Sequence, residues 1–353
     1  MAIHNDAERG AFSGNKSGMI FTLLFIIVSI LLILDIFLGS VSISPSEVIR
    51  ALFTDEANGF TTIILKFRVP KAFTALIVGI GLSLSGLQMQ TIFRNPMAGP
   101  DVLGISSGAS LGVAIVILGA SSSLRAEGLN GLDNWILVTA SWAGAGAVMI
   151  LIMFISSRVK EIMTILILGI MLSGGISAIV TILQYFSNET MLKAFVIWTM
   201  GSLGNLTSDQ LNVLFISVAA GSIISIFSAK MLDALHLGES YAQSVGLNVR
   251  LARVVIFSCT SILAGSVTAF CGPIGFIGIA VPHIARIIFR TSNHRILIPG
   301  SMLTGAGVML ASDIISQLPG SDSVLPLNAI TSLIGIPVVV WVIFRNRRYS
   351  GLF

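Results

Sequence analysis

The most regular feature of the chain is a series of long apolar stretches separated by short polar segments that often contain proline or glycine. About 20 helical residues, each rising about 1.5 Å, cross the roughly 30 Å hydrocarbon layer of a membrane. The pattern therefore predicts an all-α integral membrane protein with about ten transmembrane helices. We place these spans at residues 19–38, 72–93, 102–120, 134–155, 162–185, 211–228, 254–271, 274–289, 297–316 and 328–344.

Composition supports this prediction. Apolar residues make up 54% of the chain and charged residues only 10%, whereas about a quarter of a soluble domain is charged. The first apolar run exceeds the roughly 7–15 residues of a signal-peptide core, and further spans follow it, so we interpret it as a retained span. We expect an N-terminal tail at 1–18, one transmembrane domain at 19–344 and a C-terminal tail at 345–353.

The distribution of positive charge predicts the orientation. With both termini in the cytoplasm, 14 of the 20 Lys and Arg residues fall on the cytoplasmic side, as the positive-inside tendency favours. The six assigned to the outside are Arg50, Lys66, Arg68, Lys71, Arg125 and Lys193. We therefore predict a multi-pass membrane protein with both termini in the cytoplasm.

Two connections between spans have helical character. Ser44, Pro45 and Glu47 form a helix start on the outside, which predicts a short helix at about 45–53. On the inside, the largest connection covers residues 229–253 and offers the only surface of sufficient size for a partner. We expect this loop to be a docking surface.

An internal echo is compatible with an inverted repeat, an arrangement common in transporters. Arg68 to Lys71 precede a span that ends at Asn95–Pro100, and Arg250 to Arg253 precede a span that ends at Gly272–Phe276. In the predicted topology these two spans run in opposite directions.

Ionisable residues inside membrane spans mark ion or proton routes by default, and here they are few. Asp35 and Asp313 lie near the outer ends of their spans, and we interpret both as interfacial or structural. For His283 and Arg286 we favour either snorkelling towards the membrane interface or hydrogen bonding at a helix end. The histidines and the two cysteines, Cys259 and Cys271, show no metal-site spacing, so no metal or cofactor is expected.

No lysine follows a glycine anywhere in the sequence, which excludes the Gly-x-x-x-x-Gly-Lys phosphate loop. We therefore expect that this chain does not hydrolyse ATP by itself and is not an enzyme.

Five blocks of sequence occur in an order that resembles the iron-siderophore, heme and vitamin B12 (FecCD-type) permease family. These blocks are Arg68–Lys71 with Phe93–Ala109, Trp198–Leu203, Leu237–Gly246, Gly272–Gly278 with Val281–Arg286, and Leu333–Pro337. The resemblance implies a type II importer permease fold with ten helices. It also implies as partners a second copy of the chain, two cytoplasmic ATPase subunits and an external substrate-binding protein.

The resemblance assigns an ATPase-coupling role to the pattern Gly238, Glu239, Ala242 and Gly246 in the inside loop. We expect Glu239 to complement the positive end of a helix, Ala242 to keep a slim face for docking, and Gly246 to allow a turn. A surface helix with a purely structural role is the alternative.

The resemblance also implies that basic residues at the outer mouth receive acidic side chains of the binding protein. Arg68 and Lys71 occupy that motif, although lysine cannot form the planar bidentate pair of an arginine. Gln317 aligns where the vitamin B12 permease has a further docking arginine. The alternative is that Arg68 and Lys71 anchor the second span at the membrane interface.

These features predict an importer permease for an iron chelate, either a ferric siderophore or heme. Vitamin B12 is the alternative substrate. An ion-coupled secondary carrier is the alternative from another class, and the lack of central carboxylates argues against it. A membrane scaffold without transport activity is a further alternative. The sequence assigns no residues to the substrate pathway.

Overall fold

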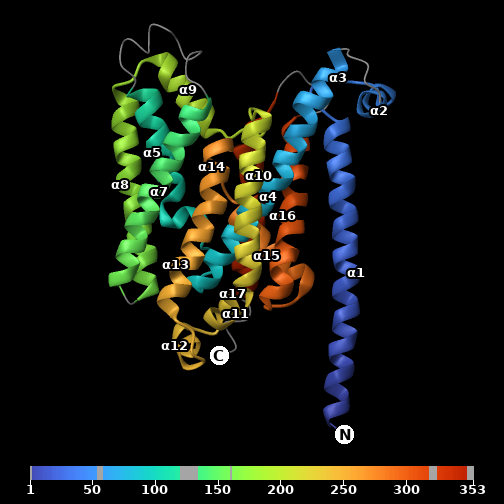
Figure 1. The fold of residues 1–353 in the computed structure, drawn as a ribbon, viewed down its shortest axis with the longest axis vertical. Coiled ribbons are helices and arrows are strands. Elements are labelled where there is room, and N and C mark those ends of the chain that lie inside the picture. Colours follow the sequence, from blue (N-terminus) through green and yellow to red (C-terminus); the bar gives the residue numbers. More distant parts are fainter. Residues whose placement is uncertain (1, 54–58, 120–133, 160, 318–323, 348–353) are drawn as a thin grey trace.

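The computed structural model describes residues 2–53, 59–119, 134–159, 161–317 and 324–347. In this part of the chain, all regular elements are helices and they form an upright bundle (Figure 1). Within these residues, seven helices are long and apolar enough to cross a membrane, and three shorter apolar helices accompany them. Together they correspond one for one to the ten predicted spans, so the prediction of an all-α bundle with about ten transmembrane helices is confirmed.

The helices that form the spans are α1 (Ala2–Phe37), α4 (Val69–Ile92), α5 (Ile105–Leu118), α7 (Asn134–Arg158), α8 (Ile162–Tyr185), α10 (Ser208–Phe227), α13 (Val249–Thr260) with α14 (Ser266–Cys271), α15 (Ile277–Phe289), α16 (His294–Ser316) and α17 (Leu327–Arg347). Shorter helices lie outside them. These are α2 (Pro45–Phe53), α3 (Gly59–Ile63), α9 (Glu189–Thr199), α11 (Ala229–His236), α12 (Glu239–Ser244) and the 3₁₀ turn η2 (Pro100–Leu103).

The connections divide between the two ends of the bundle. Helices α11 and α12, the start of α1 and the end of α17 lie at one end, whereas α2, α3 and α9 lie at the other (Figure 1). The predicted short helix at 45–53 is confirmed as α2. Helix α9 was not predicted; it begins where the Asn188 side chain accepts a hydrogen bond from the backbone of Met191.

Several predicted boundaries were too narrow or too wide. The second span begins earlier, because α3, a π-helical turn (η1, Ile64–Arg68) and α4 run on without a break from Gly59 to Ile92. The expected tail at 1–18 is helical from Ala2 and continues directly into the first span. The eighth span begins later, at Ile277, because Gly272 and Phe276 have positive φ angles of 75° and 68° that a regular helix cannot adopt.

The core of the bundle depends on close approach of helix backbones. Helix α4 is buried along most of its length, and a Cβ added to Gly86 would lie only 1.7 Å from the carbonyl oxygen of Gly278 on α15. Similarly, a Cβ on Gly79 would lie 2.2 Å from the carbonyl oxygen of Gly305 on α16. Small residues at such crossings permit the van der Waals packing that holds membrane helices together.

The two spans of the predicted internal echo share local features. Each contains a π-helical turn, η1 in the second span and η4 (Ser261–Gly265) in the seventh. Each ends at a segment rich in glycine and proline that leads into a short helix, α5 or α15. These features favour an inverted repeat, which stays a prediction.

Candidate functional site

The predicted coupling residues lie in a compact pair of helices at one end of the bundle. Gly238 joins α11 to α12 and has a φ of 119°, and Gly246 has a φ of 87°, so both positions favour glycine. The backbone N–H groups of Ala242 and Leu247 donate to the carbonyls of Gly238 and Ala242, at 2.9 Å each. The loop at 229–253 therefore has a defined shape before any partner binds.

Glu239 is held by a bidentate ion pair within the chain. Arg253, on α13, donates from Nε and Nη2 to the two carboxylate oxygens of Glu239 at 2.9 Å and 2.7 Å. Its Nη1 donates to the carbonyl oxygen of Val159 at 3.0 Å. One guanidinium thus ties the start of α12 to α13 and to the α7–α8 connection, so Glu239 positions the loop.

Ala242 does not lie on an exposed docking face, contrary to our expectation. It is fully buried within the chain, because α12 packs against α11 and α13. On α12 and at its two ends, the exposed large apolar side chains are Leu237, Tyr241 and Val245, which we call the coupling patch. The sequence carried a signal for this patch, since Leu237, Tyr241 and Val245 follow one another at spacings of four.

A second polar connection joins α11 to the bundle. Asp233 Oδ1 accepts hydrogen bonds from the backbone N–H of His294 at 2.9 Å and lies 2.7 Å from its Nδ1. The other ring nitrogen of His294 lies 2.8 Å from the hydroxyl of Thr91. A movement of α11 would therefore be transmitted to the start of α16 and to the end of α4.

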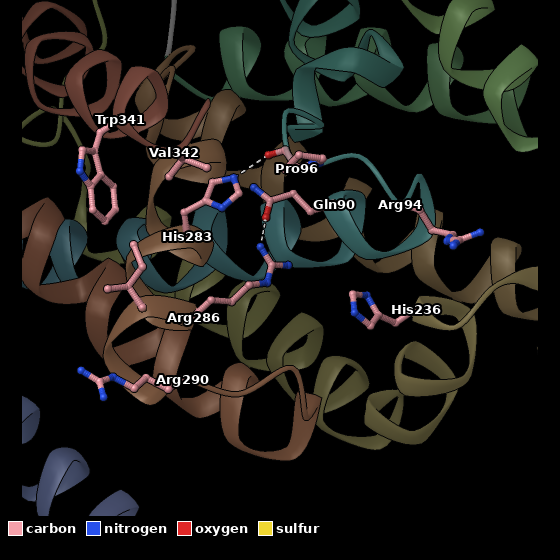
Figure 2. A pocket seen from close by; sticks show the side chains of 10 residues that line it. Gln90, Arg94, Pro96, His236, His283, Arg286, Arg290, Trp341 and Val342 are labelled. Carbon is pink, nitrogen blue, oxygen red and sulfur yellow. Dashed lines mark hydrogen bonds between the residues drawn. The ribbon is translucent and has the colours of Figure 1, made fainter. Parts of the chain in front are cut away.

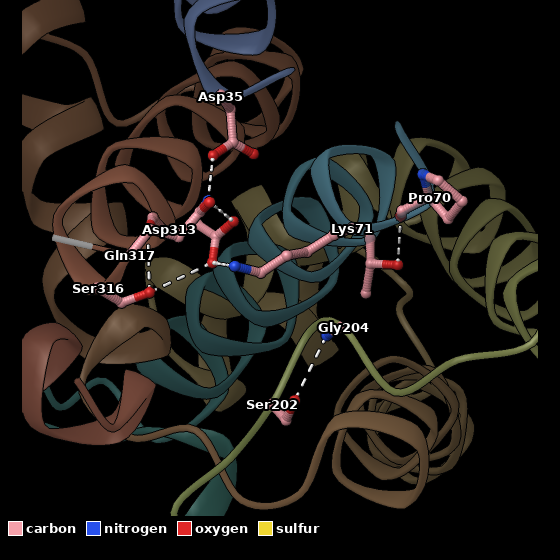
Figure 3. Close-up of polar contacts among 9 residues, drawn as sticks. Asp35, Pro70, Lys71, Ser202, Gly204, Asp313, Ser316 and Gln317 are labelled. Carbon is pink, nitrogen blue, oxygen red and sulfur yellow. Dashed lines mark hydrogen bonds and ion pairs between the residues drawn. The ribbon is translucent and has the colours of Figure 1, made fainter. Parts of the chain in front are cut away.

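At the opposite end of the bundle, two buried carboxylates share polar partners (Figure 3). Lys71 Nζ lies 3.0 Å from Asp313 Oδ1, and Gln317 Nε2 donates to both Asp35 and Asp313 at 3.0 Å. This cluster joins α1, α4 and α16. The structural interpretation of Asp35 and Asp313 is consistent with these contacts, and Gln317 bridges them.

Arg68 is also engaged within the chain. Its guanidinium donates to the carbonyl oxygens of Ile36, Phe37 and Val41, at and just beyond the end of α1. Terminal helix carbonyls lack partners within their helix, and a cation there is favourable. Because Arg68 is buried and Lys71 is only about one-fifth exposed, their docking role stays a proposal.

A large basic cavity opens between the ends of α4, α15 and α17 beside α11 (Figure 2). Its volume is about 1010 Å³. His283 Nε2 lies 2.7 Å from the carbonyl oxygen of Pro96, and Arg286 donates to the side-chain oxygen of Gln90. These contacts agree with the expected hydrogen-bonding role of His283 and Arg286, but the cavity itself was not predicted.

Neither of the two cysteines lines the basic cavity. Cys259 and Cys271 are both buried and unpaired, as expected for packing residues. Among the described residues, no group of three or more His, Cys, Asp or Glu side chains could hold a metal ion.

The bundle of spans, with a structured loop held to it at one end by hydrogen bonds and an ion pair, is the architecture of a polytopic membrane protein of the transporter class. The chain belongs to the FecCD transport family, whose model matches residues 25–345.

Relatives cover nearly the whole chain. The vitamin B12 import system permease protein BtuC of Escherichia coli O9:H4 (strain HS) is 32% identical over 326 residues, which cover 92% of this chain and 94% of the relative. The hemin transport system permease protein HmuU of Yersinia pestis is 34% identical over 330 residues, covering 92% and 95%.

A solved structure has the same architecture. It is described as an inward-facing conformation of a candidate metal-chelate type ABC transporter, and it is 29% identical in sequence with a TM-score of 0.78. The similarity covers 93% of this chain and 99% of that one. The predicted type II permease fold is thereby confirmed.

Proposed function

We propose that this chain is the transmembrane permease subunit of an ATP-binding-cassette importer that carries an iron chelate, a ferric siderophore or heme, into the cell. The observation that carries this proposal is the preformed α11–α12 loop, which exposes the coupling patch and is fixed to the bundle through Asp233 and Glu239. Such a loop can receive force from a partner and pass it to several spans. Vitamin B12 remains the alternative substrate, since relatives serve either vitamin B12 or hemin.

The proposed assembly contains two copies of the chain, two cytoplasmic ATPase subunits and an external binding protein. It would lie in the bacterial inner membrane with both termini and the α11–α12 loop in the cytoplasm. ATP-driven closure of the ATPases would move α11 and α12, and the contacts of Asp233 and Glu239 would tilt α4, α13 and α16. The chain itself performs no covalent chemistry.

The coupling patch is the proposed contact with the ATPase. Leu237, Tyr241 and Val245 expose between about half and three-fifths of their surface, and buried aromatic anchors carry much of the energy of protein interfaces. Glu239, Gly238, Ala242 and Gly246 then serve this contact by shaping the loop.

Binding-protein docking is proposed at the opposite end, around Arg68 and Lys71. Lys71 is part of an internal ion pair with Asp313, so an acidic group of the binding protein would compete with Asp313 for it. Release of Asp313 would loosen the contact between α4 and α16, which gives docking a route into the bundle.

The proposal is tested by reconstitution. The chain is placed in liposomes with the ATPase and the binding protein encoded beside it, and uptake of a ferric siderophore, hemin or vitamin B12 is measured with and without ATP. We expect uptake of an iron chelate that requires both partners and ATP. Uptake by this chain alone, driven by an ion gradient, would instead establish a secondary carrier.

A further inference from the structure

The basic cavity has a lining of one charge sign. Arg94, Arg286 and Arg290 line it together with His236 and His283, and no carboxylate is among the described residues that line it. A cleft lined by charges of one sign focuses the electric field and concentrates ligands of the opposite sign. The electrostatics of this cavity therefore select an anion.

The electrostatic effect of these arginines is evident at His236. Burial lowers the pKa of His236 below its ordinary value, and the positive charges of Arg286 and Arg94 lower it further, whereas Asp233 opposes the shift. The charges of Arg94, which follows α4, and of Arg286, on α15, thus act at one point in the cavity.

Two of the arginines are held in an unusual backbone conformation. Arg94 has a φ of 47° and Arg290 a φ of 50°, in the left-handed region where glycine fits more easily. Both follow the ends of helices, α4 and α15, and both side chains are exposed. Their guanidinium groups are therefore free to move towards a ligand, whereas Arg286 is held by Gln90.

The size of the cavity and its other lining residues further restrict the class of ligand that it can bind. A volume of about 1010 Å³ lies at the upper end of the range for small-molecule sites, roughly 300–1000 Å³. Trp341, Ile287 and Val342 add an apolar and aromatic wall beside the arginines. This combination suits a bulky ligand that carries carboxylate or catecholate oxygens on an aromatic or apolar body.

We propose that this basic cavity is a binding site for an anionic metal chelate on its way from the bundle to the cytoplasm. The inference rests on the proposed function and specifies the substrate class as a chelate with anionic oxygen groups. Arg94 and Arg290 bind these groups by charge-assisted hydrogen bonds, and Trp341 contacts the body of the ligand.

The site is tested on the purified full-length chain in nanodiscs of phosphatidylcholine. Trp135, Trp142 and Trp198 are replaced by phenylalanine, so that Trp341 is the only fluorescent indole left. The probes are an anionic ferric tris-catecholate and a neutral ferric trihydroxamate of similar size. We expect saturable quenching of Trp341 by the anionic probe alone, weakened by added salt.

Substitution of both exposed arginines, Arg94→Gln with Arg290→Gln, should raise the half-saturation concentration of the anionic probe at least tenfold. The matched control is Arg158→Gln, an exposed arginine at the end of α7 that does not line the cavity. It should leave binding unchanged. Equal quenching by both probes, or binding insensitive to the double substitution, would overturn the proposal.

The same samples distinguish the proposed chelate from two other possible occupants of the cavity, a phosphate group and the ATPase. If inorganic phosphate at matched ionic strength or an anionic lipid in the nanodisc abolishes quenching while the chelate cannot displace it, the site binds phosphate groups and the proposal is wrong. If the double variant binds the probe normally but no longer co-purifies with the ATPase, the cavity is a protein-docking socket. ATP-driven uptake of a neutral chelate, without binding of the anionic one, would overturn this inference and leave the proposed function intact.

Discussion

At the scale of single residues, the motif residues shape the loop and leave the partner surface to others. Glu239 is occupied by Arg253, and Ala242 is buried inside the chain. A bulky residue at Ala242 would therefore overpack the loop itself, at a cost of about 1–3 kcal/mol, and would not probe an ATPase contact cleanly. The exposed positions that can report on that contact are Tyr241 and its neighbours.

The bidentate ion pair between Arg253 and Glu239 gives a first prediction. Lysine keeps the charge but cannot form two parallel hydrogen bonds with a carboxylate, and it cannot also reach the carbonyl of Val159. Arg253→Lys should therefore weaken the anchorage of α12, since hydrogen bonds to charged groups contribute about 1.5–3 kcal/mol. We expect faster proteolysis within 229–253 and a reduced yield of transported substrate per ATP hydrolysed.

Arg250→Lys is the matched control, because Arg250 lies one turn earlier on α13 and is exposed. It should retain the protease resistance and transport stoichiometry of the unsubstituted chain. Equal protease resistance and equal transport stoichiometry in the two variants would show that the ion pair between Arg253 and Glu239 does not hold the loop.

Close backbone contact gives a second prediction at this scale. A Cβ on Gly86 would collide with the carbonyl oxygen of Gly278, whereas a Cβ on Gly146 would meet no atom within 4 Å. Gly86→Ala should force α4 and α15 apart and destabilise the bundle by about 3 kcal/mol, the upper end of ordinary overpacking. Gly146→Ala should be neutral or slightly stabilising.

The measurement is thermal unfolding of the full chain in detergent, followed by the loss of soluble protein on heating. A fall in the midpoint for Gly86→Ala but not for Gly146→Ala is the expected result. Equal midpoints would mean that this crossing is looser than the structure describes.

At the scale of elements, the spans were predictable and their ends were not. The apolar runs located every span, because a membrane helix must be apolar over a known length. The start of the second span was missed because Lys66, Arg68 and Lys71 read as loop residues. Arg68 donates hydrogen bonds to carbonyls at the end of α1, and Lys71 forms an ion pair with Asp313. These contacts join segments that are distant in sequence, so no local pattern reveals them.

The interior of the 229–253 loop was only partly predictable. Its helical potential and its position between the sixth and seventh spans were visible, but the burial of Ala242 depends on how α12 packs against α11 and α13. The basic cavity was likewise hidden, because Arg94, Arg286 and Trp341 come from three segments far apart in sequence. Motif resemblance indicated this loop as the candidate coupling element, and packing decides which of its residues face outwards.

The coupling patch gives a prediction for this element. Tyr241→Glu places a charge in the centre of the proposed apolar contact, and loss of an aromatic anchor there should cost about 2 kcal/mol or more, a Kd increase of about 30-fold. Gln243→Glu is the control, since Gln243 is exposed two residues away and points from the other side of α12.

The affinity of each variant for the ATPase is measured in nanodiscs, together with circular dichroism to confirm helix content. We expect Tyr241→Glu to fold normally and lose the ATPase. Retention of full affinity would place the ATPase contact outside the coupling patch.

At the scale of the whole molecule, the distribution of contacts suggests how the two ends communicate. The Asp35, Lys71 and Asp313 cluster fixes α4 and α16 at one end, while the contacts of Asp233, His294 and Thr91 join α11 to the same two helices at the other. Helices α4 and α16 therefore connect the proposed binding-protein side to the proposed ATPase side. This arrangement requires the end with Lys71 to face the outside and the end with α11 to face the cytoplasm.

That orientation is the last prediction, and positive charge motivates it. The end with α11 and α12 holds basic residues: Arg94 and Arg290 line one cavity with His236 of α11, and Arg250 lies at the start of α13, the helix that follows α12. Cytoplasmic loops are enriched in Lys and Arg. Ser244 on α12 and Ser208 at the start of α10 are both exposed serines at opposite ends of the bundle. The native cysteines are both buried, so a cysteine introduced at either serine can be labelled selectively. A membrane-impermeant maleimide should label Ser208→Cys in intact cells and should label Ser244→Cys only after the membrane is permeabilised. Labelling of Ser244→Cys from outside, with Ser208→Cys protected, would invert the molecule and remove the α11–α12 loop from the reach of any cytoplasmic ATPase.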